Sequence, residues 1–338
     1  MLCVSWLGGC ATVGWYGQAA VGQLDMLCKR EPIDRLLADP DTSEELRARL
    51  HTALEAREFA IAELALPDSS SYTYYADLER EAALWNVVAT PRFSMQPKTW
   101  CYPFVGCLAY RGYFREAAAE RRATRLAEGG YDVAVFPAVA YSTLGWFADP
   151  VINTMLAYDD VWLAGLIFHE LAHEKLFVRD DTAFNEAYAR LVEREGVRRW
   201  LRARGEDKRL AQWEADRQRQ QAFTDLLLSS RTELIDLYDS GLPEEELAAE
   251  KEAAFERLRE RIRDFARDHE TNAYRGWLER DLNNAHLASV ATYEAGVAAF
   301  AELLEVACQG DIECLHDHAA EMADWSADRR ARFLARED

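Results

Sequence analysis

Two histidines in this 338-residue chain stand four positions apart, and a glutamate directly follows the first: His169, Glu170 and His173. On an α-helix, residues four apart lie on one face, so both imidazoles can reach one metal ion. Neutral imidazole is a good zinc ligand, and a glutamate beside the pair can take a proton from water. The pattern HExxH is typical of zinc metallohydrolases, with Glu170 as the candidate general base.

The third metal ligand is expected to be a carboxylate. A catalytic zinc usually has three protein ligands and keeps a fourth position for water. No further histidine is close, because the nearest ones are His51 and His286. The acids that follow the motif are Glu174, Asp180, Asp181 and Glu186.

Glu186 has the surroundings that best suit a ligand. Asp180 and Asp181 precede an apolar periodic run and read as a turn and a helix N-cap. Glu174 continues the polar side of the HExxH helix. Glu186 lies about one turn into the next helix among largely apolar residues, and a second helix crossing the first could present it to the metal. The sequence therefore predicts one zinc ion bound by the two histidines and Glu186.

The segment NEAYA at 185–189 is similar to the NEGFA-type segment of gluzincin metalloaminopeptidases, where the glutamate is the third zinc ligand and the asparagine supports the site. More closely, most of the chain resembles a bacterial family of lipoprotein-like zinc aminopeptidases. The resembling stretches are YGQAAVGQLDMLCKREPI at 16–33, WCYPFVGCLAYRGYF at 100–114, AYSTLGWF at 140–147, HELAHEKLFVRDDTAFNEAYA at 169–189, and NNA at 283–285 with Thr292 and Tyr293.

This resemblance implies a peptide substrate and a predominantly α-helical α+β fold of gluzincin type, with a small sheet beside the HExxH helix. The chain differs from the larger gluzincin aminopeptidases in a shorter gap between HExxH and the glutamate, and in lacking a GxMxN segment before the helix. Two alternatives remain open. One is a zinc endopeptidase of the cell envelope, and the other is a catalytically silent, lipid-anchored zinc-binding scaffold. The intact Glu170 favours an enzyme.

Further site residues follow from the same resemblance. A gluzincin site needs a hydrogen-bond donor for the oxyanion, for which Tyr293 is the first candidate and His286 the second. Asn283 and Asn284 are candidates for holding a substrate backbone or terminus. All four residues also suit ordinary packing of a largely apolar helix. His316 and His318 fall in a polar tail and have no expected role.

The segment 139–147 lies directly upstream of the HExxH helix. In gluzincin-like folds the strand in this position is a sheet edge that pairs with the peptide, and backbone pairing tolerates many sequences. Tyr141 and Thr143 are therefore expected to contact substrate. An ordinary strand and turn is the alternative.

The composition and the N-terminal segment indicate the compartment in which the protein is expected. The formal net charge of -20 argues against nucleic-acid binding, which needs a basic surface. Leu7-Gly8-Gly9-Cys10 has the form of a lipobox, in which Cys10 is acylated. A basic region and a longer apolar core are missing, so we expect the natural start to lie upstream. These features predict a periplasmic lipoprotein of the bacterial cell envelope whose only membrane contact is its lipid. The alternative is a chance LGGC in a cytosolic protein.

The remaining cysteines agree with export. Two close pairs, Cys101 with Cys107 and Cys308 with Cys314, are disulfide candidates in an oxidising compartment, and Cys28 is left over. Their spacing does not suit zinc ligation.

The elements that must position these residues are mostly helices. Apolar spacing and capping residues predict helices at about 14–28, 41–65, 115–130, 160–177, 182–204, 206–239, 244–268 and 281–306. The stretches 72–75 and 85–90 are expected to form a strand or hairpin region, and 131–136 a buried strand. The charged helices from 206 to 268 predict a solvated hairpin that could act as a lid or docking arm. The expected organisation is a signal remnant (1–10), a catalytic region (11–204), the hairpin (205–270) and C-terminal helices that complete the catalytic domain (271–338).

Overall fold

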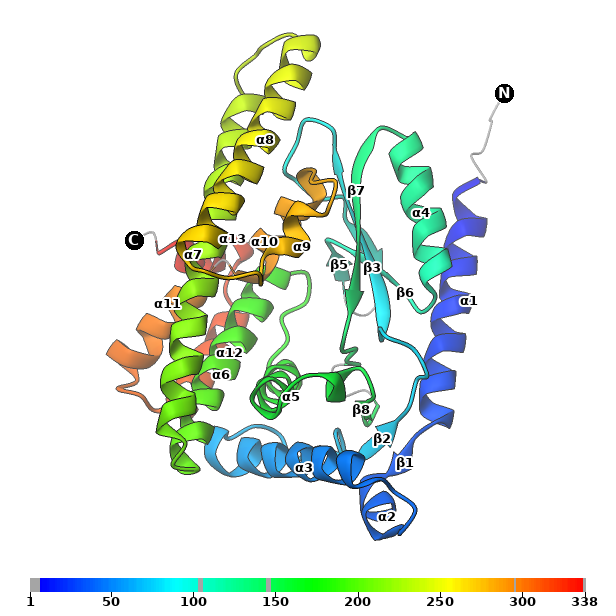
Figure 1. Ribbon diagram of the computed structural model, residues 1–338, viewed down its shortest axis with the longest axis vertical. Coiled ribbons are helices and arrows are strands. Elements are labelled where there is room, and N and C mark those ends of the chain that lie inside the picture. The colour runs from blue at the N-terminus through cyan, green and yellow to red at the C-terminus, as the bar shows by residue number, and fades with distance from the viewer. Residues whose placement is uncertain (1–6, 103–105, 144–146, 295, 337–338) are drawn as a thin grey trace. The chain divides into compact units, whose positions relative to one another are not determined.

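The computed structural model describes residues 7–102, 106–143, 147–294 and 296–336 (Figure 1). Helices prevail among them, and the strands form small sheets, as expected for a predominantly helical α+β protein. The helices are α1 (Leu7–Cys28), α2 (Ile33–Ala38), α3 (Glu44–Leu64), α4 (Glu116–Glu128), α5 (Asp160–Lys175), α6 (Thr182–Ala203), α7 (Asp207–Tyr238), α8 (Glu244–Asp268), α9 (Arg275–Leu278), α10 (Asn284–Glu294), α11 (Val297–Glu302), α12 (Ile312–Ala323) and α13 (Ala327–Ala335).

The strands are short and belong to separate sheets. They are β1 (Glu31–Pro32), β2 (Tyr74–Ala76), β3 (Leu84–Pro91), β4 (Trp100–Tyr102), β5 (Gly106–Leu108), β6 (Arg111–Tyr113), β7 (Tyr131–Ala138) and β8 (Val151–Ile152). The sheet orders are β1-β2-β8, β6-β3-β7 and β4-β5. In the first sheet β2 runs antiparallel to β1 and parallel to β8.

The chain divides into two compact units. The first comprises residues 1–87, 112–122 and 135–177, and the second comprises residues 88–111, 123–134 and 178–338. The domain boundaries expected from the sequence stay a prediction.

In the first unit α3 packs along α5, and both helices lie in the lower part of Figure 1. The buried face of α3 follows the helical repeat, with Leu50, Ala53 and Leu64 at 0% exposure. The Phe59 ring of α3 lies 5.9 Å from the Phe168 ring of α5. Because α3 covers it, α5 is buried on most sides, which places the HExxH residues in a largely apolar setting.

Aspartate caps begin the two helices that carry the motifs. The Asp159 carboxylate accepts a hydrogen bond from the Trp162 amide at 2.8 Å, and that of Asp181 accepts one from the Phe184 amide at 3.2 Å. Each bond satisfies an amide that has no partner within its helix. The expected starts of α5 and α6 are thereby confirmed.

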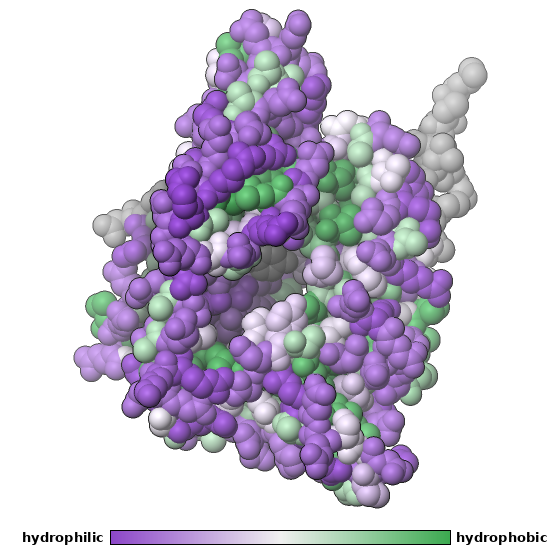
Figure 2. Space-filling model, in the orientation of Figure 1, coloured by the Kyte–Doolittle hydropathy of each residue, from purple (hydrophilic) through white to green (hydrophobic). Residues whose placement is uncertain are grey.

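In the second unit α7 and α8 form the expected antiparallel hairpin, with its outward face mainly hydrophilic (Figures 1 and 2). Its inner face is not solvated, because it forms a hydrophobic core. The buried members of that core are Met95, Phe223, Leu227, Leu234, Ala254, Phe255, Leu258, Ile262, Leu282 and Leu287. This packing joins the hairpin to the rest of the second unit along much of its length.

Several expected elements differ in the structure. The prediction of a strand at 139–147 is wrong for the residues that the structure describes. Residues 139–143 and 147 have no strand conformation, and β7 ends at Ala138. The regions at 72–75 and 85–90 do not pair with each other, because β2 and β3 lie in different sheets. The helix expected at 281–306 is divided at Gly296, whose φ of +87° is the left-handed conformation that favours glycine.

The cysteine pairs agree with expectation. The sulfur atoms of Cys101 and Cys107, which face each other across β4 and β5, lie at disulfide distance, as do those of Cys308 and Cys314. Cys28 is free and exposed. Within the described residues, none of the helices has the length and apolar character to span a membrane.

Candidate metal centre

The two histidines of the HExxH motif face a common point. The Nε2 atoms of His169 and His173 lie 3.1 Å apart, and each residue is 7% exposed. Two nitrogens that each lie about 2.0–2.1 Å from a tetrahedral zinc would be roughly 3.3 Å apart. The pair therefore has the separation that one shared zinc ion requires.

Glu186 completes the group. Its carboxylate and the ring nitrogens of His169 and His173 all lie within 4.8 Å of one another. Glu186 is the fifth residue of α6, and it is half-buried. Two imidazoles and one carboxylate are the donor set of a catalytic zinc that keeps a position for water. The residues present thus fit the metal expected from the sequence.

The neighbouring aspartates have other partners. The Asp180 carboxylate accepts a hydrogen bond from the Cys107 amide at 2.7 Å. Asp181 caps α6 and also forms an ion pair with Arg330 at 2.6 Å. Both aspartates stabilise the connection that leads into α6, which leaves Glu186 as the carboxylate in the group.

The buried side chain of Asn185 stabilises the segment between α5 and α6. Its side chain donates a hydrogen bond to the Val178 carbonyl and accepts one from the Val178 amide, both at 2.7 Å. Asn185 is 2% exposed, so these bonds are shielded from water. The asparagine thereby fixes the chain before α6, one residue from Glu186.

One known protein family matches most of the chain. The family described as "Putative aminopeptidase" matches residues 14–334. The chain belongs to this family. Neither the curated proteins nor the solved structures contain a match to the chain. Membership of this aminopeptidase family supports a peptidase that acts on peptides.

One buried contact in this aminopeptidase-family chain was missed by the sequence analysis. The hydroxyl of Tyr188 lies 2.8 Å from Nδ1 of His316, which is 4% exposed. Placing His316 in a polar tail was therefore wrong, because α12 is amphipathic and turns this histidine toward α6. The 3.6-residue spacing of Ile312, Leu315 and Ala319 was the signal that could have shown it.

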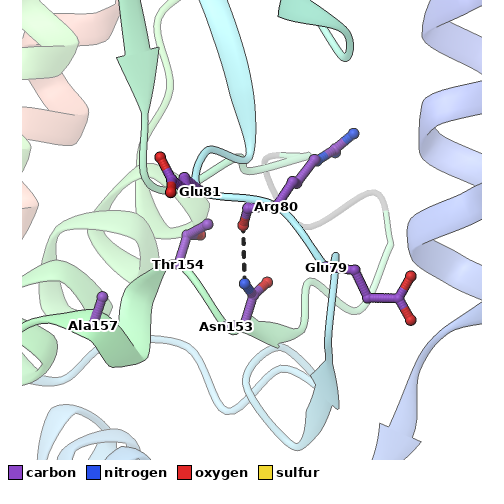
Figure 3. A pocket seen from close by; sticks show the side chains of 6 residues that line it. All are labelled: Glu79, Arg80, Glu81, Asn153, Thr154 and Ala157. Carbon is purple, nitrogen blue, oxygen red and sulfur yellow. Dashed lines mark hydrogen bonds between the residues drawn. The ribbon is translucent and has the colours of Figure 1, made fainter.

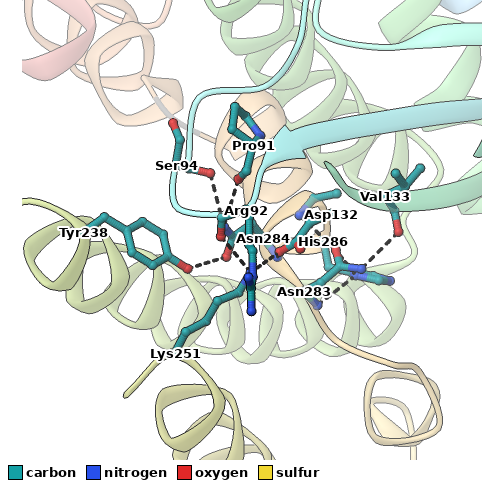
Figure 4. A network of polar contacts seen from close by, with 11 residues as sticks. Pro91, Arg92, Ser94, Asp132, Val133, Tyr238, Lys251, Asn283, Asn284 and His286 are labelled. Carbon is teal, nitrogen blue, oxygen red and sulfur yellow. Dashed lines mark hydrogen bonds and ion pairs between the residues drawn. The ribbon is translucent and has the colours of Figure 1, made fainter. Parts of the chain in front are cut away.

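Asn284 lies in a dense polar network (Figure 4). Its amide donates hydrogen bonds to the carbonyls of Pro91, Arg92 and Ser94 at 3.4, 3.1 and 3.2 Å. Its side-chain oxygen accepts one from the Tyr238 hydroxyl at 2.8 Å. Asn284 is 0% exposed, and the protein occupies both ends of its side chain. Asn284 therefore has a structural role, and its substrate-binding role stays a prediction.

Asn283 and His286 lie in the same network (Figure 4). Asn283 donates to the Val133 carbonyl and accepts from the Ala285 amide, both at 3.0 Å, and its side-chain oxygen lies 3.1 Å from Nδ1 of His286. Burial lowers the pKa of His286 to about 4, so its imidazole is neutral at pH 7. A neutral ring can still donate one hydrogen bond, and the catalytic role of His286 stays a prediction.

Two expected site residues lie where the structure describes no side chain. Tyr293, the first candidate for the oxyanion donor, belongs to α10, but its side chain is outside the described residues. Cys10, the candidate for lipidation, belongs to α1, and its side chain is likewise outside them. Both roles stay predictions.

Tyr141 and Thr143 lie in an irregular segment rather than at a sheet edge. The Tyr141 ring packs at 5.3 Å against the Phe114 ring, and burial raises the Tyr141 pKa to about 12. The Thr143 amide and hydroxyl donate hydrogen bonds to Asp149 at 2.7 and 2.8 Å. The Thr143 amide is thereby occupied and is not available to a neighbouring strand.

Two other features of the described residues lie apart from this chemistry. A hollow of about 420 Å³ is lined by Glu79, Arg80, Glu81, Asn153, Thr154 and Ala157 (Figure 3). Asn153 already donates to the Arg80 carbonyl at 3.0 Å, and the hollow contains none of the expected site residues. Cys308, Cys314 and His318 also lie close together, but the two sulfurs are bonded to each other and cannot both bind a metal.

Proposed function

We propose that the protein is a zinc aminopeptidase in which His169, His173 and Glu186 hold one Zn²⁺ and Glu170 is the general base. The observation that carries this proposal is the convergence of the three ligand groups within 4.8 Å. Family membership supports the peptidase activity, and the donor set supports the metal.

The residues around the ligands have definite tasks in this mechanism. Zinc, when bound, supplies Lewis-acid activation of a water molecule and of the scissile carbonyl. Glu170, directly after the first ligand on α5, takes the proton from the attacking water and then passes it to the leaving amine. The buried setting of α5 limits competing water and strengthens the interactions of these charges.

The location proposed from the sequence belongs to the same account. A lipid on Cys10 would tether the enzyme to a membrane of the bacterial cell envelope, where peptides are available. Two cysteine pairs at disulfide distance support an oxidising compartment. Mass spectrometry of the mature N-terminus tests the lipid, since the account expects a diacylglyceryl-modified Cys10.

The activity is tested with one peptide pool in two forms, with free and with acetylated N-termini. We expect hydrolysis of the free pool, its loss in the presence of a zinc chelator, and a fall of at least about 100-fold in Glu170→Gln, in line with the weight of general-base catalysis. Glu63→Gln, an exposed acid of α3, is the matched control. Equal cleavage of the acetylated pool would indicate an endopeptidase, and absence of cleavage in both pools would refute the proposal.

A further inference from the structure

The segment that leads into α12 contains a second group of metal-binding side chains. Cys308, Cys314 and His318 each offer one ligand atom, and these atoms lie within 4.8 Å of one another. Cys308 follows the π-helical turn Leu303–Ala307, whereas Cys314 and His318 are four positions apart on α12 and share one face. Cys308 is 5% exposed, and the other two residues are half-buried. In the described part of the chain, the only other group of this kind is the candidate metal centre.

Backbone contacts hold the loop between the two cysteines in place. The Gly310 amide donates a hydrogen bond to the Leu304 carbonyl at 2.8 Å, and the Asp311 amide donates one to the Cys308 carbonyl at 2.9 Å. The Arg199 side chain donates to the Gly310 carbonyl at 2.6 Å. The φ of Gly310 is +83°, a conformation that favours glycine. These contacts do not depend on the bond between the sulfurs, so we expect the two thiols to stay adjacent when that bond is broken.

The position of His318 is set by α12. The Asp311 carboxylate accepts a hydrogen bond from the Glu313 amide at 3.0 Å and caps the helix, which fixes where it begins. The Glu321 carboxylate lies 3.7 Å from Nδ1 of His318. A carboxylate beside a metal-binding histidine orients the ring and raises its basicity. His318 thus has the kind of neighbour that metal-binding histidines usually have.

Two thiolates and one imidazole are a soft donor set that suits Zn²⁺. Three protein ligands leave one tetrahedral position for water. The cysteine spacing did not predict this site, because about two to four residues usually separate the paired cysteines of zinc motifs, whereas five separate Cys308 from Cys314. The histidine one helical turn after Cys314 supplies the third ligand. While the two sulfurs are bonded to each other, however, they cannot both bind a metal.

We propose that Cys308, Cys314 and His318 bind one Zn²⁺ when the disulfide between the two cysteines is reduced by a dithiol. The dithiol gives up two electrons and two protons and itself becomes a disulfide. Zn²⁺ then binds both sulfurs as thiolates, and the two thiol protons are released. The redox state of the surroundings therefore determines whether the metal site exists. None of the three residues belongs to the candidate metal centre, so the inference is independent of the proposed peptidase activity.

Cobalt(II) is the probe that distinguishes this site from the HExxH centre. Thiolate ligands give Co²⁺ an intense charge-transfer absorption in the near ultraviolet, which histidine and carboxylate ligands do not give. The full chain is reduced with a dithiol, separated from the reductant without oxygen, and titrated with Co²⁺. We expect the band in the reduced protein, its absence in the unreduced protein, and its disappearance when Zn²⁺ displaces the cobalt. Metal analysis should show one more zinc equivalent in the reduced chain than in the unreduced one.

Paired cysteine variants assign the band. The double variant Cys308→Ser with Cys314→Ser should lose it. Cys101→Ser with Cys107→Ser is the matched control, because these cysteines have the same separation of 6 in the sequence and are also at disulfide distance. This control should keep the full band. A band that depends on Cys101 and Cys107, or a reduced protein without a band, would overturn the proposal.

His318→Ala tests the third ligand and leaves both cysteines in place, so it decides the matter even if the double cysteine variant fails to fold. Competition with a chromogenic zinc chelator should show that the reduced variant binds Zn²⁺ at this site at least about 10-fold more weakly. The exposed His51→Ala should bind it as the unchanged protein does. Equal zinc affinity in His318→Ala and His51→Ala would contradict the proposed ligand set.

Discussion

The carboxylate of Asp181 lies 2.6 Å from Nε of Arg330, and both side chains are largely buried. The same guanidinium donates hydrogen bonds to the carbonyls of Ala323 and Trp325 at 3.1 and 2.5 Å. One buried cation thus joins the first residues of α6 to the segment between α12 and α13. Because α6 carries Glu186, this ion pair helps to hold the third candidate ligand in place.

Arg330→Ala should lower the free energy of unfolding by about 3–5 kcal/mol, because it leaves the buried Asp181 carboxylate without its cation. Chemical denaturation followed by circular dichroism measures the change. Arg332→Ala, at an exposed position of α13, should stay within about 0.5 kcal/mol of the unchanged protein. Equal stability of the two variants would show that the ion pair does not hold α6.

Asn284→Ala should lower the free energy of unfolding by about 1–3 kcal/mol or more, since buried carbonyls at residues 91, 92 and 94 lose their donor. Thermal denaturation gives the loss, with the exposed Asn272→Ala as control. If Asn284 instead binds substrate, KM will rise while stability stays near that of the control.

His286 should make the protein less stable in acid. Its folded pKa of about 4 lies below the ordinary value of 6.5 because of burial first and then the charge of Arg280, with Asp281 and Asp132 opposing. Between these values the unfolded chain binds the proton more readily. The stabilisation is therefore complete above pH 6.5 and is lost as the pH falls toward 4, by up to about 3 kcal/mol at 1.4 kcal/mol for each pKa unit.

Denaturation of His286→Gln at a series of pH values checks this sign. Between pH 6.5 and 4, the free energy of unfolding of His286→Gln should fall less steeply with falling pH than that of the unchanged protein. The exposed His51→Gln should keep the full pH dependence. An unchanged slope in His286→Gln would mean that the imidazole is already charged or well solvated in the folded protein.

Much of the candidate centre could be predicted because its residues are close in sequence. The HExxH spacing works only on a helix, and the capping aspartates at 159 and 181 fix where both helices begin. The group of His169, His173 and Glu186 then follows from two consecutive helices.

The missed residues depend on contacts between distant segments. His316 lies against the Tyr188 hydroxyl, and the two residues are 128 positions apart in the sequence. Residues 139–143 and 147 form no strand, and the Asp149 carboxylate accepts a hydrogen bond from the Thr143 amide, which a sheet partner would otherwise use. The sequence suggested that Asn284 contacts substrate. In the structure its buried hydrogen-bond partners come from a segment about 190 residues earlier in the chain. Local patterns carry no signal for such long-range pairs.

Metal content of the purified protein, measured by mass spectrometry, tests the central claim most directly. The account predicts one zinc per chain, at least a 10-fold loss of zinc affinity in Glu186→Ala, and full retention in Glu170→Gln together with loss of peptide hydrolysis. Glu193→Ala, another acid of α6, should keep the metal. A protein without zinc, or a Glu186→Ala variant that binds zinc as tightly as the unchanged chain, would contradict the proposed centre.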